Sequence, residues 1–429
     1  MMPGCCALFF AFLHITKRQK KIQLVILFVI FVDMVIDRIA FKELLPHLKN
    51  RQVTVITGMR RVGKSTAMHF LMQQVKHDNK IAFDCERIEV RTLFNRPDYE
   101  SIVDELKLYG LNFAKPAVIA LDEIQLIENL PSFIKYVYDT YGVKFIVTGS
   151  SAYYMKNRFS ESLSGRKRIF EMYPLSFPEF LQFKKSLYPE YGQYALKPFD
   201  AAWYNRCKKL YEEYIRFGGF PEVALQRKVS DKKELLRDII NSYIEMDVKL
   251  LSDYSVSDEL YKLVKLLAAR TGSKVDYTKL GSVAGLHRHK VNNYLQLMES
   301  TFLIYLVKPF TKNIDKEVSQ QPKIYFSDTG IMNELAGEQL SGGQVFENAI
   351  ATQLKGLGEI QYYQKKSGQE IDFIFKGNMA VEVKQTAIEQ DKQTLTQRAG
   401  AIGIKKKMLV SRYLPADGFS GFVWGGNIF

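Results

Sequence analysis

Four residues in the first quarter of the chain combine backbone freedom with a cation and a hydroxyl at a fixed spacing. Gly58, Gly63, Lys64 and Ser65 fit the pattern G-x-x-x-x-G-K-[ST], between a β-type run at 53–57 and an apolar helical pattern. The glycines let the backbone curl so that its N–H groups point inward, and the following helix adds the positive end of its dipole. These features favour a site for a nucleoside triphosphate, with ATP expected, over an ordinary glycine-rich turn. The residues predicted to contact the nucleotide are Gly58, Arg60, Arg61, Val62, Gly63, Lys64, Ser65 and Thr66.

An acidic pair follows a second apolar run. Residues 117–121 are typical of a buried parallel strand, and Asp122 and Glu123 stand at its carboxyl end, where open α/β sheets bind ligands. This is the Walker B pattern. We expect Asp122 and the Ser65 hydroxyl to hold Mg²⁺, Lys64 to reach the β- and γ-phosphates, and Glu123 to orient or polarise the attacking water.

The next predicted strand, at 144–152, ends in polar residues. A polar side chain at this point would lie between the loop and the γ-phosphate, and Ser150 is the first choice for that sensor role, with Thr148 next. Serine is also a good helix cap, so the end of the strand is equally compatible with a strand-to-helix cap.

Basic residues gather after this strand, in the stretch 157–180. Arg166, in the turn Ser-Gly-Arg, is the candidate for an arginine supplied to the nucleotide of a neighbouring subunit, where it would stabilise the charge of phosphoryl transfer. The alternatives are a solvated basic loop or a loop that contacts nucleic acid.

The last ninety residues contain a second set of charged residues with catalytic spacing. Glu382 and Lys384 are two apart on one predicted strand, so both side chains project from the same face. A turn at 376–378 can bring Asp372 of the preceding strand beside them, and Glu347 lies on a predicted helix upstream. These are the parts of a PD-(D/E)xK nuclease core, with Asp372, Glu382 and Glu347 binding Mg²⁺ and Lys384 acting on the attacking water. Alternating charges on a solvated strand face would look similar.

A possible nucleic-acid surface precedes this region. Helical patterns at 260–269, around 280–283 and at 291–298 are followed by a strand pattern at 302–310, an order that suggests a winged helix. The basic run 287–290 opens the last of these helices, where contacts to bases and phosphates usually lie. Winged helices also serve as protein–protein adaptors, so both interpretations stay open.

Several of these motifs together resemble one family. The segments are GMRRVGKS, ALDEIQ, VTGSSA, LSGR, YPLSFPEF and GGFPE, the last at 218–222, and the likeness runs from about residue 34 to the C-terminus. The chain is similar to bacterial and archaeal AAA-type ATPases that carry a C-terminal domain of unknown function. The resemblance implies a P-loop fold, ATP binding, slow hydrolysis and a C-terminal domain similar to nuclease folds. Ile371 stands where the nuclease motif has proline, which puts activity of that domain in doubt.

Length and composition limit the organisation. At 429 residues the chain is too long for one core, and 60 Lys and Arg against 46 Asp and Glu leave a net charge of +14, which favours nucleic acid or an anionic surface. We expect an α/β protein with a P-loop NTPase parallel sheet at 34–185 and a helical lid or linker at 186–255, in which GGFPE turns the chain back towards the nucleotide. A winged-helix-like domain at 256–335 and a restriction-endonuclease-like α/β domain at 336–429 would follow.

The first 33 residues differ from the rest. A basic cluster at 17–21 precedes the apolar run 22–32, which is too short to span a bilayer. We expect a disordered extension or an over-extended start, with a membrane-associated N-terminus as the alternative. The four cysteines show neither zinc spacing nor a disulfide framework, which favours the cytoplasm.

Two functions fit these features. The first is an ATPase coupled to cleavage or remodelling of DNA, working alone or as a homo-oligomer. The second is an ATP-gated switch that grips DNA or protein through the winged helix and an inert nuclease-like domain. A membrane-docked ATPase is the less favoured third.

Overall fold

The computed structural model describes residues 35–149, 163–186, 189–248, 258–311, 320–365 and 367–429. Every helix and strand named below lies in one compact unit, residues 37–429. Among the described residues, no helix has both the length and the apolar run that crossing a bilayer requires.

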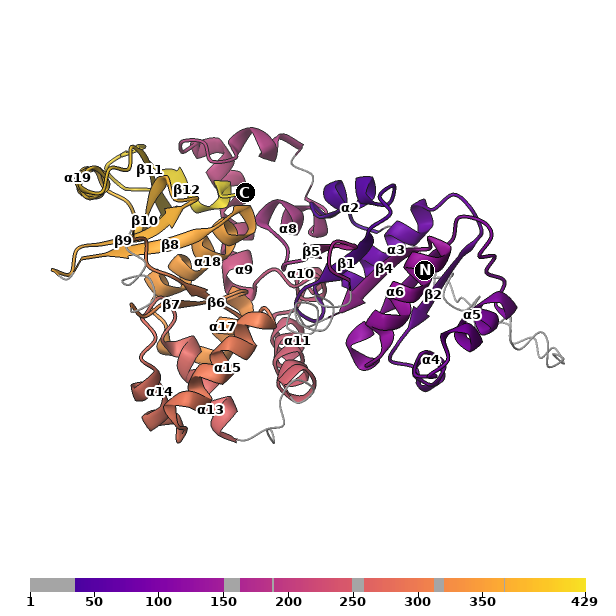
Figure 1. Cartoon of the computed structure of the whole chain (residues 1–429). Helices are drawn as coiled ribbons and strands as arrows, with labels where there is room; N and C mark the ends of the chain where they lie inside the picture. Colours follow the sequence, from indigo (N-terminus) through magenta and orange to yellow (C-terminus); the bar gives the residue numbers. More distant parts are fainter. Residues whose placement is uncertain (1–34, 150–162, 187–188, 249–257, 312–319, 366) are drawn as a thin grey trace, which may run out of the picture. The chain divides into compact units, whose positions relative to one another are not determined.

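The first half of the chain folds around a five-stranded parallel sheet in the order β2-β3-β4-β1-β5. Every residue of β1, β3 and β4 is buried, as expected for central strands of a parallel sheet covered on both faces. Helices α3 and α6 pack against β4 (Figure 1). The strands are β1 (Val53–Thr57), β2 (Lys80–Asp84), β3 (Val118–Asp122), β4 (Lys144–Gly149) and β5 (Lys167–Glu171), and the helices are α2 (Phe41–His47), α3 (Lys64–Gln74), α4 (Ile88–Phe94), α5 (Tyr99–Leu108), η1 (Ile124–Leu126) and α6 (Leu130–Tyr141).

The middle of the described chain is helical. Ser176 and Glu179 form a capping box at the start of α8, which fixes where the chain leaves the first sheet. The elements are α8 (Phe177–Phe183), η2 (Pro189–Tyr194), α9 (Ala201–Phe217), α10 (Pro221–Leu225), α11 (Val229–Ser242) and the π-helical η3 (Tyr243–Val248).

Three helices and a two-stranded antiparallel sheet follow, in the order predicted for residues 256–335. The strands β6 and β7 pair from Ile304 with Phe326 to Val307 with Lys323. The elements are α13 (Asp258–Ala269), α14 (Tyr277–Ala284), α15 (Arg288–Ser300), β6 (Ile304–Val307), β7 (Lys323–Phe326), α17 (Thr329–Ala336) and η4 (Gly337–Gln339). The assignment to the winged-helix class stays a prediction.

The C-terminal part holds a second five-stranded sheet, in the order β12-β11-β10-β9-β8. Strands β8, β9 and β10 run antiparallel, whereas β10, β11 and β12 run parallel. The turn between β9 and β10 has φ of 66° at Gly377, so the predicted hairpin is confirmed. The elements are α18 (Gly342–Leu357), β8 (Ile360–Gln364), β9 (Glu370–Phe375), β10 (Met379–Thr386), α19 (Glu389–Ala401), β11 (Lys406–Tyr413), β12 (Val423–Trp424) and η5 (Gly425–Asn427).

An aromatic core joins α9 to this second sheet. The rings of Tyr211 and Trp424 lie 5.0 Å apart, and the indole nitrogen of Trp203 donates to the Asn427 side chain at 2.9 Å. The core therefore crosses the domain boundaries predicted at 255 and 335, because helical spacing of aromatic residues does not say which distant element they pack against.

Candidate functional site

The predicted phosphate-binding loop connects β1 to α3. Gly58 has φ of 148° and Gly63 has φ of 99°, both in the region that side chains rarely adopt. A Cβ at Gly58 would lie 2.1 Å from the backbone oxygen of Met172, the residue that follows β5. Glycine at 58 is therefore required by the close approach of the neighbouring chain as well as by the turn.

Lys64 lies inside this loop. Its side chain is buried, and its ammonium donates to the backbone oxygen of Met59 at 2.9 Å. Ser65 follows on the first turn of α3 and is half-buried, and Thr66 is exposed. A buried ammonium requires charged or strongly polar partners, and the Met59 carbonyl is one of those of Lys64 in this structure.

Asp122, Glu123 and Thr148 meet at the carboxyl ends of β3 and β4. The Thr148 hydroxyl donates to a carboxylate oxygen of Asp122 and accepts from the backbone N–H of Glu123 at 3.2 Å. Glu123 has φ of 52°, and the Gln125 amide donates to its carboxylate. Thr148, the second choice for the sensor role, therefore lies beside the acidic pair, whereas Ser150, the first choice, lies outside the described residues.

A further acidic residue, Glu86, was missed by the sequence analysis. It follows β2, and partial burial and then the charge of Glu123 raise the pKa of its carboxyl. The guanidinium of Arg60, from the phosphate loop, lies 3.8 Å from it. Glu86 could have been found because β2 ends at the same sheet edge as β3.

A buried arginine, Arg38, donates a hydrogen bond to the backbone of the phosphate loop. Arg38 pairs with Glu179 at 2.8 Å, and it donates to the backbone oxygens of Val62 and Tyr173, each at 2.8 Å. The two paired side chains are 7% and 6% exposed. The backbone N–H of Ile39 donates to the same carboxylate at 2.8 Å, so Glu179 joins the start of the described chain to the YPLSFPEF segment.

The GGFPE turn reaches the phosphate loop, as predicted. The Glu222 carboxylate lies 3.7 Å from the guanidinium of Arg61. Asp328, at the start of α17, accepts from the backbone N–H of Gly219 at 2.7 Å, and the Gly219 oxygen accepts from Leu175 at 2.6 Å. The turn therefore contacts the phosphate loop on one side and α17 on the other.

Arg166 lies at the opposite end of the first sheet. Its backbone oxygen accepts from Val53, the first residue of β1, whereas the phosphate loop follows the last residue of that strand. Its side chain pairs with Asp139 at 2.8 Å. Arg166 therefore does not lie at the phosphate loop of its own chain, and its role at a neighbouring subunit stays a prediction beside the alternatives of a solvated basic loop and a nucleic-acid contact.

The second set of predicted residues gathers on α18, β9 and β10. Asp372 accepts from the backbone N–H of Val383 at 2.8 Å, and the Lys384 ammonium donates to Glu382 at 2.7 Å. Glu347 accepts from the hydroxyl of Tyr325 at 2.6 Å. The hairpin therefore brings Asp372 beside β10, and Glu347 faces the same carboxylates from α18.

One carboxylate of this cluster, Glu382, has an oxygen that a hard cation could bind. The Glu382 side chain is 6% exposed, and its second oxygen is buried without a hydrogen-bond partner among the described residues. An unmet buried carboxylate oxygen is what Mg²⁺ would satisfy. As the side chains stand, no three His, Cys, Asp or Glu residues within the described part of the chain are close enough together to hold a metal ion.

The same carboxylates predict a pH dependence of stability. Burial, and then the charge of Asp372, raises the pKa of both Glu347 and Glu382 to about 7. The folded state therefore holds these protons longer than the unfolded state. The resulting stability is complete below about pH 4.5 and is lost as the pH rises through about 7.

Without divalent metal, we expect the free energy of unfolding to fall between pH 5 and 8, by an amount on the order of 3 kcal/mol. The variant Glu382→Gln should flatten that slope, because glutamine does not titrate, and Glu359→Gln, at an exposed position, should leave it unchanged. Urea unfolding at several pH values measures both. A slope that is the same in Glu382→Gln and wild type contradicts the assignment.

The basic start of α15 is open to solvent. His287, Arg288 and His289 are exposed, and Lys290 lies 3.5 Å from the Glu259 carboxylate. Three of the four predicted contact residues therefore face outward, and the helix N-terminus that they surround would add to the attraction of a phosphate group.

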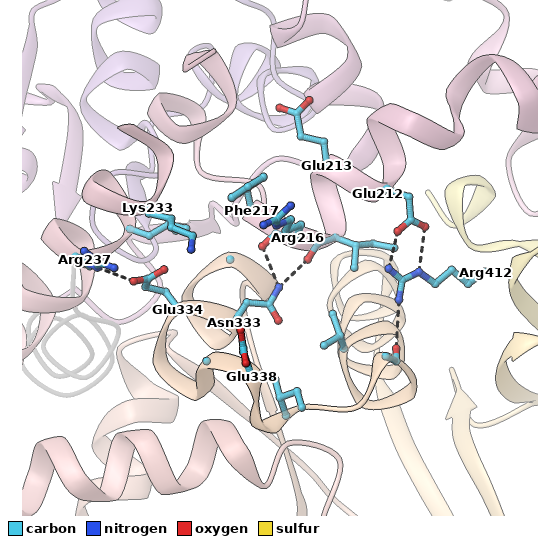
Figure 2. Close-up of a pocket in the computed structure, with 17 residues that line it drawn as sticks. Glu212, Glu213, Arg216, Phe217, Lys233, Arg237, Asn333, Glu334, Glu338 and Arg412 are labelled. Atoms are coloured by element: carbon cyan, nitrogen blue, oxygen red, sulfur yellow. Dashed lines mark hydrogen bonds and ion pairs between the residues drawn. The ribbon is translucent and has the colours of Figure 1, made fainter. Parts of the chain in front are cut away.

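A cavity of about 860 Å³ lies between α9, α11 and α17, remote in sequence from the phosphate loop. The ion pairs Arg412–Glu212 and Arg237–Glu334 each measure 2.6 Å. In Figure 2 the two side chains of each pair face each other. The Asn333 amide donates to the last carbonyls of α9. These contacts hold α17 and β11 against α9 along the walls of the cavity.

Comparisons with known proteins cover much of the chain. Residues 50–181 match a family model described as an AAA domain, and residues 208–341 match a domain of unknown function (DUF8612). The second match spans the predicted boundary at 255 between the helical lid and the winged helix.

The curated relatives are themselves uncharacterized proteins. One from Methanocaldococcus jannaschii is 27% identical over 352 residues, which are 80% of this chain and 75% of the relative. One from Haemophilus influenzae is 25% identical over 359 residues, 80% of this chain and 84% of the relative.

The similarity of this chain to solved structures is weaker. The Orc1 protein of Aeropyrum pernix in complex with DNA is 12% identical, with a TM-score of 0.33 over 71% of this chain and 94% of that one. AMPPCP-bound DnaA from Aquifex aeolicus is 16% identical, with a TM-score of 0.27 over 63% and 89%. Scores this low carry no argument about fold or function.

The family match and the local geometry agree on one part of the chain. The matched residues 50–181 contain the loop at 58–66, the acidic pair Asp122 and Glu123, Thr148 and the parallel sheet that positions them. This part of the chain is similar to an AAA domain, and it carries a phosphate-loop motif between β1 and α3.

Proposed function

We propose that the protein binds ATP at the loop 58–66 and hydrolyses it with Mg²⁺. The observation that supports this most strongly is the buried Lys64 ammonium, enclosed by its own loop at the end of β1, with the acidic ends of β2 and β3 at the same sheet edge. The backbone N–H groups of the loop and Lys64 would bind the phosphates.

The residues around the loop would have separate roles in binding the metal ion and activating the attacking water. Ser65 and Asp122 would hold Mg²⁺, which when bound offsets the charge of the transferring phosphoryl group. Thr148 keeps the Asp122 carboxylate oriented, and Glu123 would take the proton of the attacking water or polarise it. Magnesium-dependent release of phosphate from ATP by the purified protein tests this function.

Arg166 would complete the reaction only in a homo-oligomer. Its position at the far end of β1 and β5 supports a role at the nucleotide of an adjacent subunit, after its pair with Asp139 opens. Such an arginine lowers the barrier by facing the charge that develops on the phosphoryl oxygens.

The partner that we propose is DNA. The net charge of +14 and the exposed residues His287, Arg288 and His289 at the start of α15 support it. In this function α13, α14 and α15 with the β6–β7 sheet form a winged helix, and α15 contacts the phosphate backbone.

A second activity, metal-dependent cleavage of nucleic acid, is favoured by the buried Glu382 oxygen that lacks a partner. Asp372, Glu382 and Glu347 would hold one or two Mg²⁺ ions, and Lys384 would stabilise the attacking water beside the phosphate. The alternative is an inert domain that grips its partner, in which the pair of Lys384 with Glu382 only stabilises the fold.

Replacing both Asp372 and Glu382 with alanine separates these alternatives. For an active nuclease, we expect the double variant to lose nicking of plasmid DNA in Mg²⁺ or Mn²⁺ by at least about 10²-fold, because the hard oxygen ligands are gone. ATP hydrolysis should be unchanged, because these residues lie outside the P-loop domain. Wild type that cleaves neither DNA nor RNA, or a double variant that cleaves as well as wild type, identifies the inert domain.

A further inference from the structure

The cavity between α9, α11 and α17 has no part in the activities proposed above. Its volume of about 860 Å³ falls within the range of roughly 300–1,000 Å³ that ligand-binding pockets usually have. Part of its lining is apolar and buried, contributed by Ile215 and Phe217 of α9 and by Leu236 of α11. A pocket of this size with apolar surface can take up part of a partner molecule.

The charged residues of the lining carry both signs in equal number. Four are carboxylates and four are cations, so the cavity has no net charge with which to attract a polyanion such as nucleic acid. Three of the carboxylates are already in ion pairs, which are Glu212 with Arg412, Glu213 with Lys184 and Lys232, and Glu334 with Arg237. The nucleic-acid partner proposed for α15 is therefore not the one that this cavity fits.

Three charged side chains of the lining are left to meet a ligand. Arg216, Lys233 and Glu338 are exposed, and within the described ranges none of them is in an ion pair. Arg216 stands on the last turn of α9 and Lys233 on α11, whereas Glu338 belongs to η4, after α17. In Figure 2 the two cations lie above Asn333 and Glu338 lies below it. An acidic group is therefore expected on one side of the cavity and a basic group on the other.

Asn333 stands between these charges and offers a hydrogen-bond acceptor. Its amide nitrogen donates to the backbone oxygens of Ile215 and Arg216, at 3.1 Å and 2.9 Å. Those bonds fix the amide, and no residue in the described part of the chain donates to its oxygen. A fixed carbonyl oxygen beside an apolar surface is suited to a backbone N–H of an extended peptide.

The walls of the cavity are held together by the protein itself. The Arg412 guanidinium of β11 bonds both carboxylate oxygens of Glu212, at 3.0 Å and 2.6 Å, and donates to the Gly342 oxygen at the start of α18 at 3.3 Å. Glu213 of α9 accepts from the ammonium of Lys232 of α11 at 2.6 Å. A site that is already formed in this way needs little ordering of its own walls when a ligand binds.

We propose that this cavity binds a peptide segment of a protein partner, in which apolar residues lie between an acidic and a basic residue. The acidic residue would face Arg216 and Lys233, and the basic residue would face Glu338. A backbone N–H between them would donate to Asn333. The separation of the two charge signs, the apolar lining and the fixed amide together support this chemistry. The inference does not depend on ATP binding or on nuclease activity.

The test is binding of short labelled synthetic peptides to the full chain, followed by fluorescence polarisation. Four classes of equal length and apolar content are compared, which carry one acidic and one basic residue, two acidic residues, two basic residues or no charge. We expect the mixed-charge class to bind wild type with the lowest Kd. Lys233→Glu should raise that Kd by about tenfold or more, because an attraction becomes a repulsion, and Glu338→Lys should do the same.

Each variant should also change which peptides bind. Lys233→Glu is expected to lower the Kd of the class with two basic residues, and Glu338→Lys that of the class with two acidic residues. Glu234→Lys is the matched control, because Glu234 is an exposed neighbour of Lys233 on α11 that does not line the cavity, and it should leave all four Kd values unchanged. Thermal unfolding of each variant shows that the fold is retained, and either cavity variant decides the question if the other does not fold.

Three results would overturn the proposal. They are the absence of binding to wild type by any peptide class, a wild-type preference for a class other than the mixed one, and a mixed-class Kd that both Lys233→Glu and Glu338→Lys leave unchanged. Binding of labelled single-stranded DNA that Lys233→Glu abolishes, with no peptide bound, would assign the cavity to nucleic acid instead.

Discussion

Replacing Glu123 with glutamine is expected to leave ATP bound and to slow hydrolysis by about 10²–10⁴-fold, the usual contribution of a positioned general base. Glutamine has nearly the same shape, but it cannot take a proton from water. The neighbouring groups should hold it in place, because Thr148 bonds the backbone N–H of Glu123 and Gln125 bonds its side chain. Phosphate release at saturating ATP and Mg²⁺ measures the effect.

The matched control is Glu89→Gln, an exposed glutamate on α4, which should turn over at the wild-type rate. Glu86 is a further carboxylate at this sheet edge, and it lies beside Arg60. If Glu123→Gln keeps more than about a tenth of wild-type turnover while Glu86→Gln loses it, the base is Glu86 and the assignment of Glu123 is wrong.

Replacing Arg38 with alanine is expected to destabilise the fold by about 3–5 kcal/mol, the usual effect of removing one partner of a buried ion pair. The substitution leaves Glu179 charged and enclosed, and it removes the donors to the backbone oxygens of Val62 and Tyr173. Because Val62 belongs to the phosphate loop, ATP affinity should fall as well. Urea unfolding and ATP titration measure the two effects separately.

Two further variants show whether the ion pair with Glu179 or the hydrogen bond to Val62 causes each effect. Arg168→Ala removes an arginine whose pair with Glu43 is exposed, so it should cost no more than about 1 kcal/mol. Arg38→Met combined with Glu179→Met removes both charges and should recover only part of the stability, because Glu179 also caps α8 and accepts from Ile39. It should not recover the ATP affinity, because no donor to Val62 returns. Loss of stability without loss of ATP affinity in Arg38→Ala would show that Arg38 stabilises the fold but does not contribute to ATP binding.

The elements of the nucleotide site could be predicted from sequence because local chemistry determines them. The strand before Gly58, the helix after Gly63 and the apolar strand before Asp122 all follow from short patterns, and each stands where it was expected. The hairpin that brings Asp372 beside β10 follows from the turn at Gly377 in the same way. In both cases residues that are near in sequence decide the structure.

Contacts between distant segments could not be predicted in this way. Arg38 and Glu179 are 141 positions apart, and Lys323 and Glu370 are 47 apart, with no shared motif to connect them. The left-handed backbone of Glu123 is likewise invisible in the sequence, because φ above zero is uncommon outside glycine. Such pairings depend on which surfaces meet after the elements have formed.

The GGFPE turn contacts both the phosphate loop and the start of α17. Glu222 faces Arg61 of the phosphate loop, and Gly219 is held by Asp328 of α17. Both residues of the first pair are partly exposed, so this pair is weak, whereas the bond to Asp328 is buried. Phosphates that attract Arg61 would therefore weaken its pair with Glu222, whereas the bond between Gly219 and Asp328 would be kept.

Calorimetric titration of ATP and Mg²⁺ into wild type and Lys64→Ala tests most directly whether the loop 58–66 is a nucleotide site. Lys64 is the cation expected to reach the β- and γ-phosphates, and its substitution leaves Asp122 and Glu123 in place. We expect wild type to bind one ATP per chain and Lys64→Ala to bind at least about 10²-fold more weakly, with both proteins folded. Equal affinity in the two proteins, or no binding of ATP by wild type, would contradict the assignment of the loop as a nucleotide site.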